Sequence, residues 1–375
     1  MDFTFSPEQQ GVFEAARGLL EAKATPERVA VIEKSSRVFD QELWSELSKT
    51  GLVSLTISEE FSGAGLSMVE AATLLVEQGR RVAQVPLLGH LVGSWLLTRL
   101  CTASTGQHYL PSLASGELIC CVGLSGLNST RELDGHLVSG DLLADGSLIL
   151  TGTLPCVRSL TLAQVLVVAF KINGTLGEGL AVVDLNAQGV NISKIETTDL
   201  QEWGCLVLGQ VRVDPNNVLA LSVGSTCEAV ETAYNAYLVG LCALQFGVCD
   251  QAVIEAAAYT SQRHQFGKPL ASFQGVALRA ADCFIDAQAI GTTMWQSAWK
   301  LSEGLDCTKE VAVAKWWAAE AGHRVVHGVQ HLHGGMGADV TYPIHRYFLW
   351  GKQLELEMGS GPVCLISLGR ALAAS

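Results

Sequence analysis

The chain has 375 residues, of which 49% are apolar and 16% are charged, and its net charge is −13. So large an apolar fraction excludes a disordered chain, and the length excludes a small scaffold that depends on disulfides. The acidic balance argues against nucleic acid as a partner, because that binding needs a clustered basic surface.

The first zone, predicted as a helical domain over residues 1–114, opens with a helix start signal. Ser6 is a plausible cap, Pro7 stands at the first helical position and Glu8 lies in the first turn. Apolar residues then recur at helical spacing up to about Leu113. The N-terminal residues contain neither a basic segment nor a long apolar core, so no signal peptide is expected.

The middle zone, residues 115–222, changes its period. Short runs of β-branched or apolar residues alternate with Gly, Asn and Asp, as at 118–124, 147–151, 165–170 and 179–183. This pattern predicts an antiparallel sheet or barrel.

The last zone, residues 223–375, is predicted to be a helical bundle, which makes the whole chain α+β. Its most apolar stretch, Ala236 to Ala258, is interrupted by polar residues at 245, 250, 251 and 255. A membrane span needs about 18 or more uninterrupted apolar residues, so we expect a buried helix and no membrane. A chain this apolar that stays in water is expected to cover surface against other subunits.

The cysteines indicate the compartment. There are eleven, most of them within apolar stretches, and none forms a C-x-x-C pair. An odd number without a disulfide framework favours a reducing cytosol, so the protein is expected to be cytoplasmic.

Two segments of the last zone place polar residues in distinctive arrangements. Arg263–Pro269 joins two helices and precedes Phe273-Gln274. It is either ordinary turn chemistry or an arginine whose planar fork pairs with a phosphate. Gln330–Gly335 ends in paired glycines, which either terminate a helix or let a ligand approach the backbone. His331 and His333 do not share a helix face, so no metal site is expected.

These segments, together with Glu59–Leu66, Val211–Leu219 and Tyr342–Arg346, resemble the flavin-dependent acyl-CoA dehydrogenases over essentially the full chain. The resemblance implies an N-terminal helical domain, a middle antiparallel β domain and a C-terminal four-helix bundle. It also implies FAD as cofactor, an acyl-CoA thioester as substrate, electron-transfer flavoprotein as electron acceptor and tetrameric assembly.

One half of the family's cofactor site is retained. In the family, an R-x-x-F-G segment and a following F-Q glutamine contact the FAD of a neighbouring subunit, and a Q-x-x-G-G segment contacts the same cofactor. The matching residues here are Arg263, Phe266, Gln274, His331, Gly334 and Gly335, with His331 in place of the usual glutamine.

The other half, which holds a subunit's own flavin and substrate, departs from the family's pattern. The T-E-P-x-A-G-S-D segment corresponds to Leu124–Thr130, which is shorter and lacks the Glu-Pro. The W-I-[ST] segment that lies against the isoalloxazine ring falls on Cys156, Val157 and Arg158, so both the aromatic ring and the hydroxyl are missing.

The catalytic base is also missing from its usual positions. Removal of the α-proton of a thioester needs a carboxylate, while hydride leaves the β-carbon for the flavin. The family's two alternative base positions fall on Met358 and Tyr237, neither of which suits this role at neutral pH. Glu357, one residue from Met358, is the fallback candidate, and Glu231 is a weaker one.

Three hypotheses follow. The first is a non-catalytic partner subunit that completes the FAD site of a homologous catalytic subunit, in an α2β2 heterotetramer. The actinobacterial sterol side-chain acyl-CoA dehydrogenases resemble this arrangement, which implies steroid degradation by β-oxidation, a part of lipid metabolism. The second is a self-sufficient homotetrameric dehydrogenase that uses Glu357, and the third is a non-enzymatic binding or assembly protein on the same scaffold.

Overall fold

The computed structural model describes residues 4–124, 128 and 135–374, in which helices come first, strands follow and helices return. The first helices are α1 (Pro7–Lys23), α2 (Pro26–Glu33), α3 (Gln41–Lys49), α4 (Met68–Arg81), α5 (Leu87–Leu100) and α6 (Ala103–Ala114). The main sheet contains β1 (Cys120–Gly123), β2 (Val138–Leu142), β3 (Leu148–Arg158), β4 (Val165–Ile172), β5 (Glu178–Asp184), β6 (Val190–Ile195), β7 (Trp203–Val213) and β8 (Val218–Ser222). The C-terminal part contains α8 (Glu228–Gln262), the hairpin strands β9 (His264–Gln265) and β10 (Lys268–Pro269), α9 (Gln274–Ser302), α10 (Thr308–His333), α11 (Ile344–Leu356) and α12 (Gly361–Ala374).

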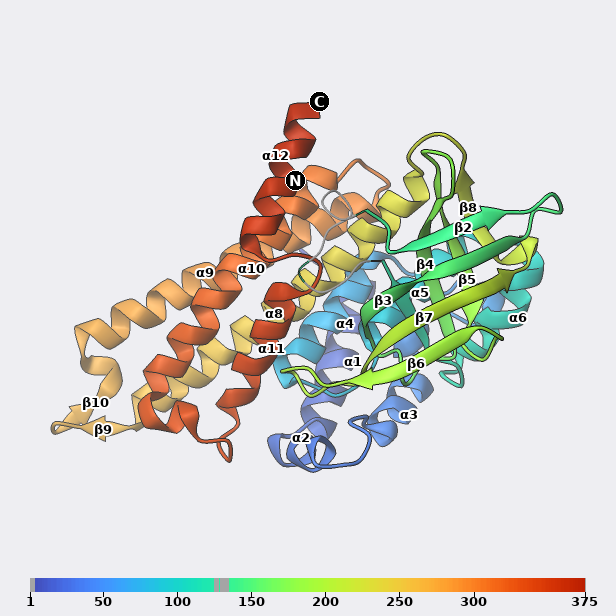
Figure 1. Cartoon of the computed structure of the whole chain (residues 1–375). Helices are drawn as coiled ribbons and strands as arrows, with labels where there is room; N and C mark the ends of the chain where they lie inside the picture. Colours follow the sequence, from blue (N-terminus) through green and yellow to red (C-terminus); the bar gives the residue numbers. More distant parts are fainter. Residues whose placement is uncertain (1–3, 125–127, 129–134, 375) are drawn as a thin grey trace.

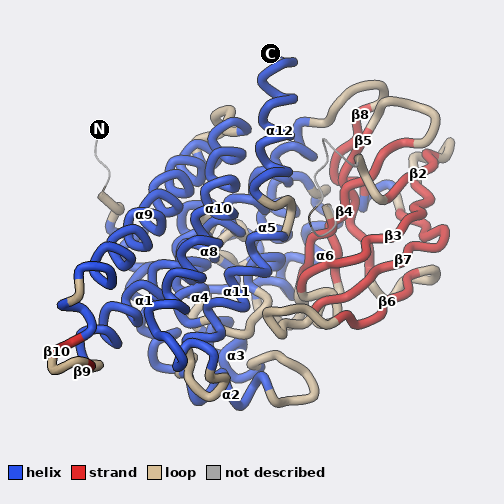
Figure 2. The backbone as a smooth tube through the Cα atoms, turned by 60° about the vertical axis from the view of Figure 1, so that its left-hand side comes forward, coloured by secondary structure: helices blue, strands red, loops and turns tan. Residues whose placement is uncertain are grey.

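This order of elements confirms the predicted α+β class, with a helical beginning, a β middle and a helical end (Figure 2). The predicted domain boundaries at 114/115 and 222/223 stay predictions. Most of the segment 124–130, whose sequence departs from the family's pattern, lies outside the described residues.

The start of α1 follows the predicted capping. The Ser6 hydroxyl accepts a hydrogen bond from the Gln9 backbone, and the Gln9 side chain accepts one from the Ser6 backbone in return. This reciprocal pair satisfies two of the donors that a helix N-terminus leaves free, which is why the helix begins at Pro7.

The main sheet has the strand order β6-β7-β3-β2-β4-β5-β8, with β1 pairing to β4. Strand β4 runs parallel to β1 and β2, and the other pairs of this sheet are antiparallel as predicted. Alternate side chains of β4 enter two different cores, because Val165 and Val167 pack with the helices while Leu166 and Val168 pack within the sheet layer. The strand is therefore apolar on both faces, which explains its unbroken apolar sequence.

Helix α8 is the central element of the helical part, and it packs against α4, α9, α10 and α11. By length and composition it could cross a membrane, but 78% of its most apolar window is buried inside the protein. That burial is typical of a core helix. The hairpin β9–β10 lies at the end of the bundle that points away from the sheet (Figure 1).

Two glycines bring α4 and α8 unusually close together. A Cβ on Gly247 would lie 2.0 Å from the carbonyl oxygen of Val76, and one on Gly79 would lie 2.3 Å from that of Leu244. Both contacts are with backbone, which cannot move aside without shifting a helix. We expect Gly247→Ala to lower the unfolding free energy by about 1–3 kcal/mol or more.

Gly18, on an exposed face of α1, is the matched control for this substitution. A Cβ there would meet nothing within 4 Å, so Gly18→Ala should stabilise the fold by roughly 0.5–1 kcal/mol. Chemical unfolding of both variants measures the difference, and equal effects of the two substitutions would contradict the close helix contact.

A buried histidine joins α5 to the sheet. His90 is fully buried, and its Nδ1 accepts a hydrogen bond of 3.4 Å from the backbone N–H of Cys120. Burial disfavours the charged imidazolium and lowers the pKa of His90 from 6.5 to about 4.

This histidine should make stability depend on pH. Its folded pKa lies below its unfolded value, so the unfolded chain takes up the proton first and stability is lost as pH falls from 6.5 to 4. The loss due to this residue is on the order of 3 kcal/mol. His90→Asn, which keeps an acceptor but does not titrate, should flatten the unfolding free energy over this pH range. His108→Asn, at an exposed histidine of α6, is the surface control for this substitution.

Candidate functional site

Arg158, the last residue of β3, is the centre of a buried polar cluster. The residue is 4% exposed. Its Nη2 donates to Glu357 Oε2 at 2.6 Å, and its Nη1 donates to Gln201 Oε1 at 2.7 Å and to Asp199 Oδ2 at 3.2 Å. Arg158 therefore binds three side chains of the chain, in addition to replacing the hydroxyl that the resemblance places at this position.

Aromatic side chains complete the walls of the cluster. The Arg158 guanidinium lies over the Trp203 ring, 4.4 Å from its centre, and Trp203 Nε1 donates to Asp199 at 3.1 Å. Tyr237, from the first third of α8, donates from its hydroxyl to Glu357 Oε1 at 2.7 Å. The sheet, α8 and the chain that follows α11 thus meet at this point.

The charges of the cluster explain its protonation. Burial opposes the charged form of Arg158, but the carboxylates of Glu357 and Asp199 outweigh it and raise the pKa of Arg158 above its ordinary value. Burial, and then the nearby Glu357, raise the pKa of Tyr237 well above 10. Tyr237 therefore stays protonated and serves as a donor.

The base candidates are placed clearly by these contacts. Glu357 is 4% exposed, and its two oxygens accept from Tyr237 and from Arg158. Both oxygens of this carboxylate are therefore already occupied by donors of the chain itself. Met358 is buried in the apolar core, with a left-handed backbone (φ +59°). Glu231 lies elsewhere, accepting from Thr308 Oγ1 at 2.6 Å.

A buried lysine holds the backbone beside Glu357. Lys315 of α10 is 1% exposed, and its Nζ donates to the carbonyls of Leu354 and Glu355 at 3.0 and 3.1 Å. These carbonyls belong to the last turn of α11, where a positive charge is favourable. Sequence reasoning missed Lys315, although a single lysine in a run of Ala, Val and Trp is a signal for such a role. It also missed Asp199, Gln201 and Trp203, because nothing local marks them.

The Arg263–Gln274 segment lies at the other end of the bundle (Figure 1). Arg263 caps the end of α8, Gln274 begins α9, and the hairpin between them turns at Phe266 and Gly267, with φ values of +53° and +79°. Phe266 is 89% exposed. A left-handed conformation costs a non-glycine residue on the order of 1 kcal/mol, and this residue also exposes an aromatic ring to water.

The end of α10 lies at the same end of the bundle as this hairpin. His333 stacks on Tyr259 with ring centres 4.6 Å apart, and the Arg263 N–H donates to the Tyr259 carbonyl at 2.9 Å. A Cβ added to Gly334 or Gly335 would meet nothing within 4 Å, so their backbone is open to a ligand.

The fit of these residues to FAD differs between the two ends. An exposed aromatic ring, an exposed arginine and open glycine backbone suit a ligand that approaches from outside the chain. At the other end, the segments that the resemblance assigns to the chain's own flavin contain Arg158 and lie beside Glu357. These two residues pair with each other inside the protein. The predicted residues therefore form two groups, and among the described residues the group around Arg263 and Gly334 is the one whose exposed side chains and open backbone fit FAD.

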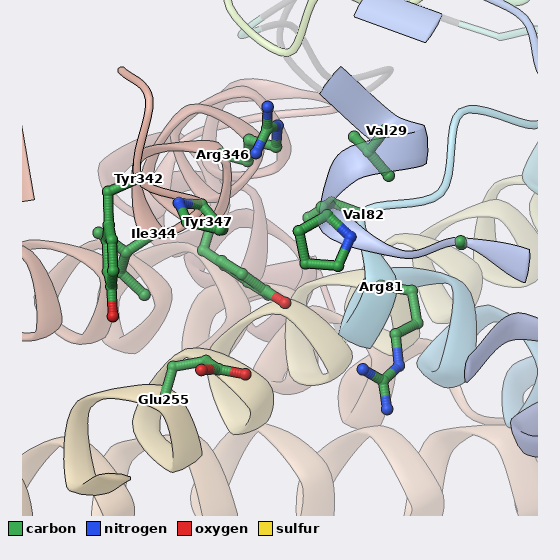
Figure 3. Close-up of a pocket in the computed structure, with 11 residues that line it drawn as sticks. Val29, Arg81, Val82, Glu255, Tyr342, Ile344, Arg346 and Tyr347 are labelled. Carbon is green, nitrogen blue, oxygen red and sulfur yellow. The ribbon is translucent and has the colours of Figure 1, made fainter. Parts of the chain in front are cut away.

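A cavity of about 130 Å³ lies between α2, α4, α8 and the start of α11. Figure 3 shows Glu255 of α8 below Tyr342 and Tyr347, with Arg81 on the opposite side. Two of its polar side chains are held within the chain, since Tyr347 donates to the Arg80 carbonyl at 2.8 Å and Arg346 donates to Glu33 at 2.8 Å. Ligand pockets usually measure about 300–1,000 Å³, so this cavity is too small for a flavin or an acyl-CoA.

Comparison with known proteins gives concordant matches. Residues 6–117 match the model for the acyl-CoA dehydrogenase N-terminal domain, and residues 229–373 match that for the C-terminal domain. Acyl-CoA dehydrogenase FadE27 of Mycobacterium tuberculosis is 34% identical over 100% of this chain and 99% of its own. Among solved structures, the Tcur3481-Tcur3483 steroid ACAD has 35% identity, a TM-score of 0.88 and 98% coverage of both chains. The ChsE4-ChsE5 complex from Mycobacterium tuberculosis has 31% identity, a TM-score of 0.90 and 100% coverage of both chains.

The ion pair of Arg158 and Glu357 should be strongly coupled. Arg158→Met leaves Glu357 and Asp199 buried without their cation, which should cost about 3–5 kcal/mol of unfolding free energy. Arg158→Met combined with Glu357→Gln should cost less than Arg158→Met alone, because the amide is neutral and still accepts from Tyr237.

Arg212, paired with Asp145 on the surface, provides the control for this experiment. Both side chains are more than half exposed, so Arg212→Met should cost no more than about 1 kcal/mol. Denaturant unfolding of the unaltered chain, Arg158→Met, Glu357→Gln and the double variant forms the cycle, and Arg212→Met is measured beside it. If Arg158→Met cost no more than Arg212→Met, the buried cluster would not be as described.

Proposed function

The chain belongs to the acyl-CoA dehydrogenase family, and from this premise we propose that it is the non-catalytic subunit of a heteromeric, FAD-dependent acyl-CoA dehydrogenase. The observation that carries the proposal is the contact of Arg158 and Tyr237 with Glu357. Both base positions of the family, together with the fallback carboxylate, lie in or beside this cluster, and none offers a free carboxylate.

The chain's contribution to the complex is the group of residues at the outer end of the bundle. Arg263 would pair with a phosphate of the FAD that the partner subunit holds, through charge-assisted hydrogen bonds. Phe266 would lie against the same cofactor, and Gly334 and Gly335 would let it approach the backbone. Gln274 and His331 would supply further polar contacts. When bound, FAD supplies the hydride acceptor for α,β-dehydrogenation of an acyl-CoA.

The homologous partner would supply the carboxylate, giving an α2β2 heterotetramer. Exposed apolar side chains support a further contact between subunits, since they follow one another along α9 and α12, as Leu278, Ile285, Trp299, Leu365 and Ile366 do. We propose a steroid side-chain CoA as the substrate class, because two similar structures are a steroid ACAD and a two-chain complex. Electron-transfer flavoprotein as acceptor and a cytoplasmic location complete the proposal.

A self-sufficient homotetramer is the second candidate, since Glu357 does place a carboxylate beside the usual base position. That function would require Arg158 to release it. Purification of the chain alone distinguishes the two. The isolated chain should bind little FAD and turn over no acyl-CoA, whereas stoichiometric flavin with dehydrogenase activity would reject the proposed subunit role.

Co-expression with a homologous catalytic subunit tests the contributed residues. Phe266→Ala should weaken FAD binding to the complex roughly three- to tenfold, because an aromatic contact contributes about 0.5–1.5 kcal/mol. Flavin fluorescence titration of the apo complex measures the affinity.

Leu176 provides the control for this titration, because it is 86% exposed but lies in the connection between β4 and β5. Leu176→Ala should leave the FAD affinity unchanged. Equal affinities of the two variants and the unaltered complex would show that the hairpin does not contact the cofactor. A partner chain that brings no flavin or activity at all would instead favour a binding or assembly protein.

A further inference from the structure

We propose that Arg158 is the residue that excludes flavin from this chain's own cofactor position and thereby sets the flavin stoichiometry of the assembly. The inference rests on the proposed function and deepens it. It assigns the exclusion of flavin to the side chain of Arg158, although the sequence departs from the family's pattern in several segments.

The first step concerns space. Arg158 ends β3, in the segment that corresponds to the flavin wall, and Glu357 lies beside the position of the base. A flavin ring and an acyl thioester stacked between the wall and the base need two layers of roughly 3.5–4 Å each. Here the guanidinium and the carboxylate are in direct contact at 2.6 Å, so the side chain of Arg158 occupies the intervening space.

The second step concerns what the guanidinium stacks on. It lies 4.4 Å from the centre of the Trp203 ring. The planar guanidinium of Arg158 thus already covers this face of the Trp203 ring. The planar cation therefore occupies a surface on which the flat ring of a cofactor could otherwise pack.

The third step concerns the charge. All three nitrogens of Arg158 are engaged, with Glu357, Asp199 and Gln201 as partners. A flavin could enter only if the arginine withdrew, which would leave two buried carboxylates without their cation. The cluster therefore resists displacement by a neutral ring.

The fourth step concerns the remaining wall. The register of β3 and β7 shifts between Leu154 and Val157, so that Pro155 and Cys156 stand opposite Cys205. Cys156 is a small side chain where the family has a tryptophan. Removal of the Arg158 side chain would thus leave room beside Cys156 on this wall, next to the Trp203 ring.

The experiment uses the complex with its partner subunit. Arg158→Ser restores a hydroxyl and removes the cation, and its combination with Glu357→Gln also removes the carboxylate left without a counterion. Arg158→Lys keeps a buried cation. After saturation with FAD and gel filtration, the flavin-to-chain ratio is measured by absorbance, and the melting temperature is measured with and without added FAD.

The unaltered complex and Arg158→Lys should carry one flavin for every two chains. Arg158→Ser, or the double variant, should approach one flavin for every chain, a rise of up to twofold, with a melting temperature that increases on adding FAD. A folded serine variant that stays at one flavin for every two chains would overturn the inference and leave the proposed function intact. An unaltered complex with one flavin for every chain would instead overturn both.

A reciprocal substitution covers the case in which the Arg158 variants do not fold. Arginine placed at the corresponding position of the flavin-binding partner should empty that subunit's site while its fold, followed by circular dichroism, persists. A folded partner that carries this arginine and retains its flavin would contradict the inference.

Discussion

The charge of Arg158 is the constraint on which the junction between sheet and bundle depends. A buried guanidinium has to be neutralised inside the protein, and its partners come from separate parts of the chain. Asp199 and Gln201 lie in the segment between β6 and β7, while Glu357 follows α11. Because a buried ion is costly when any partner is missing, this one requirement holds the sheet against the helices in a single arrangement.

The same cluster occupies both oxygens of Glu357. Glu357 is the carboxylate nearest in sequence to the family's base position, yet its oxygens are bound by Arg158 and by Tyr237. Lys315 fixes the backbone just before it. The contacts that join the sheet to the bundle therefore include the carboxylate that lies beside the family's base position.

The far end of the bundle differs from this cluster, because its distinctive groups are exposed. Phe266 combines a left-handed backbone with a ring that is almost fully exposed and meets only the edge-on ring of Phe273 among the described aromatic residues. The open backbone of Gly334 and Gly335 also contacts nothing of this chain at the Cβ positions. Such features are understandable if the stabilising contacts form with a ligand held by a second subunit. This end of the bundle lies apart from the Arg158 cluster. The residues around Arg263 and Gly334 can therefore be retained while the residues of the cluster change.

The sequence by itself determined the local elements and the class of the fold. The Ser6 cap, the strand run at 165–170 and the long apolar helix that became α8 follow from capping, period and composition, which act between near neighbours. Tertiary structure decided the parallel pairing of β1 with β4 and the state of the candidate base. Glu357 is 199 residues from Arg158 in the chain, and Tyr237 is 120 residues from Glu357. Sequence spacing could offer Glu357 as a possible base, but only the folded chain brings it to the buried cation that binds it.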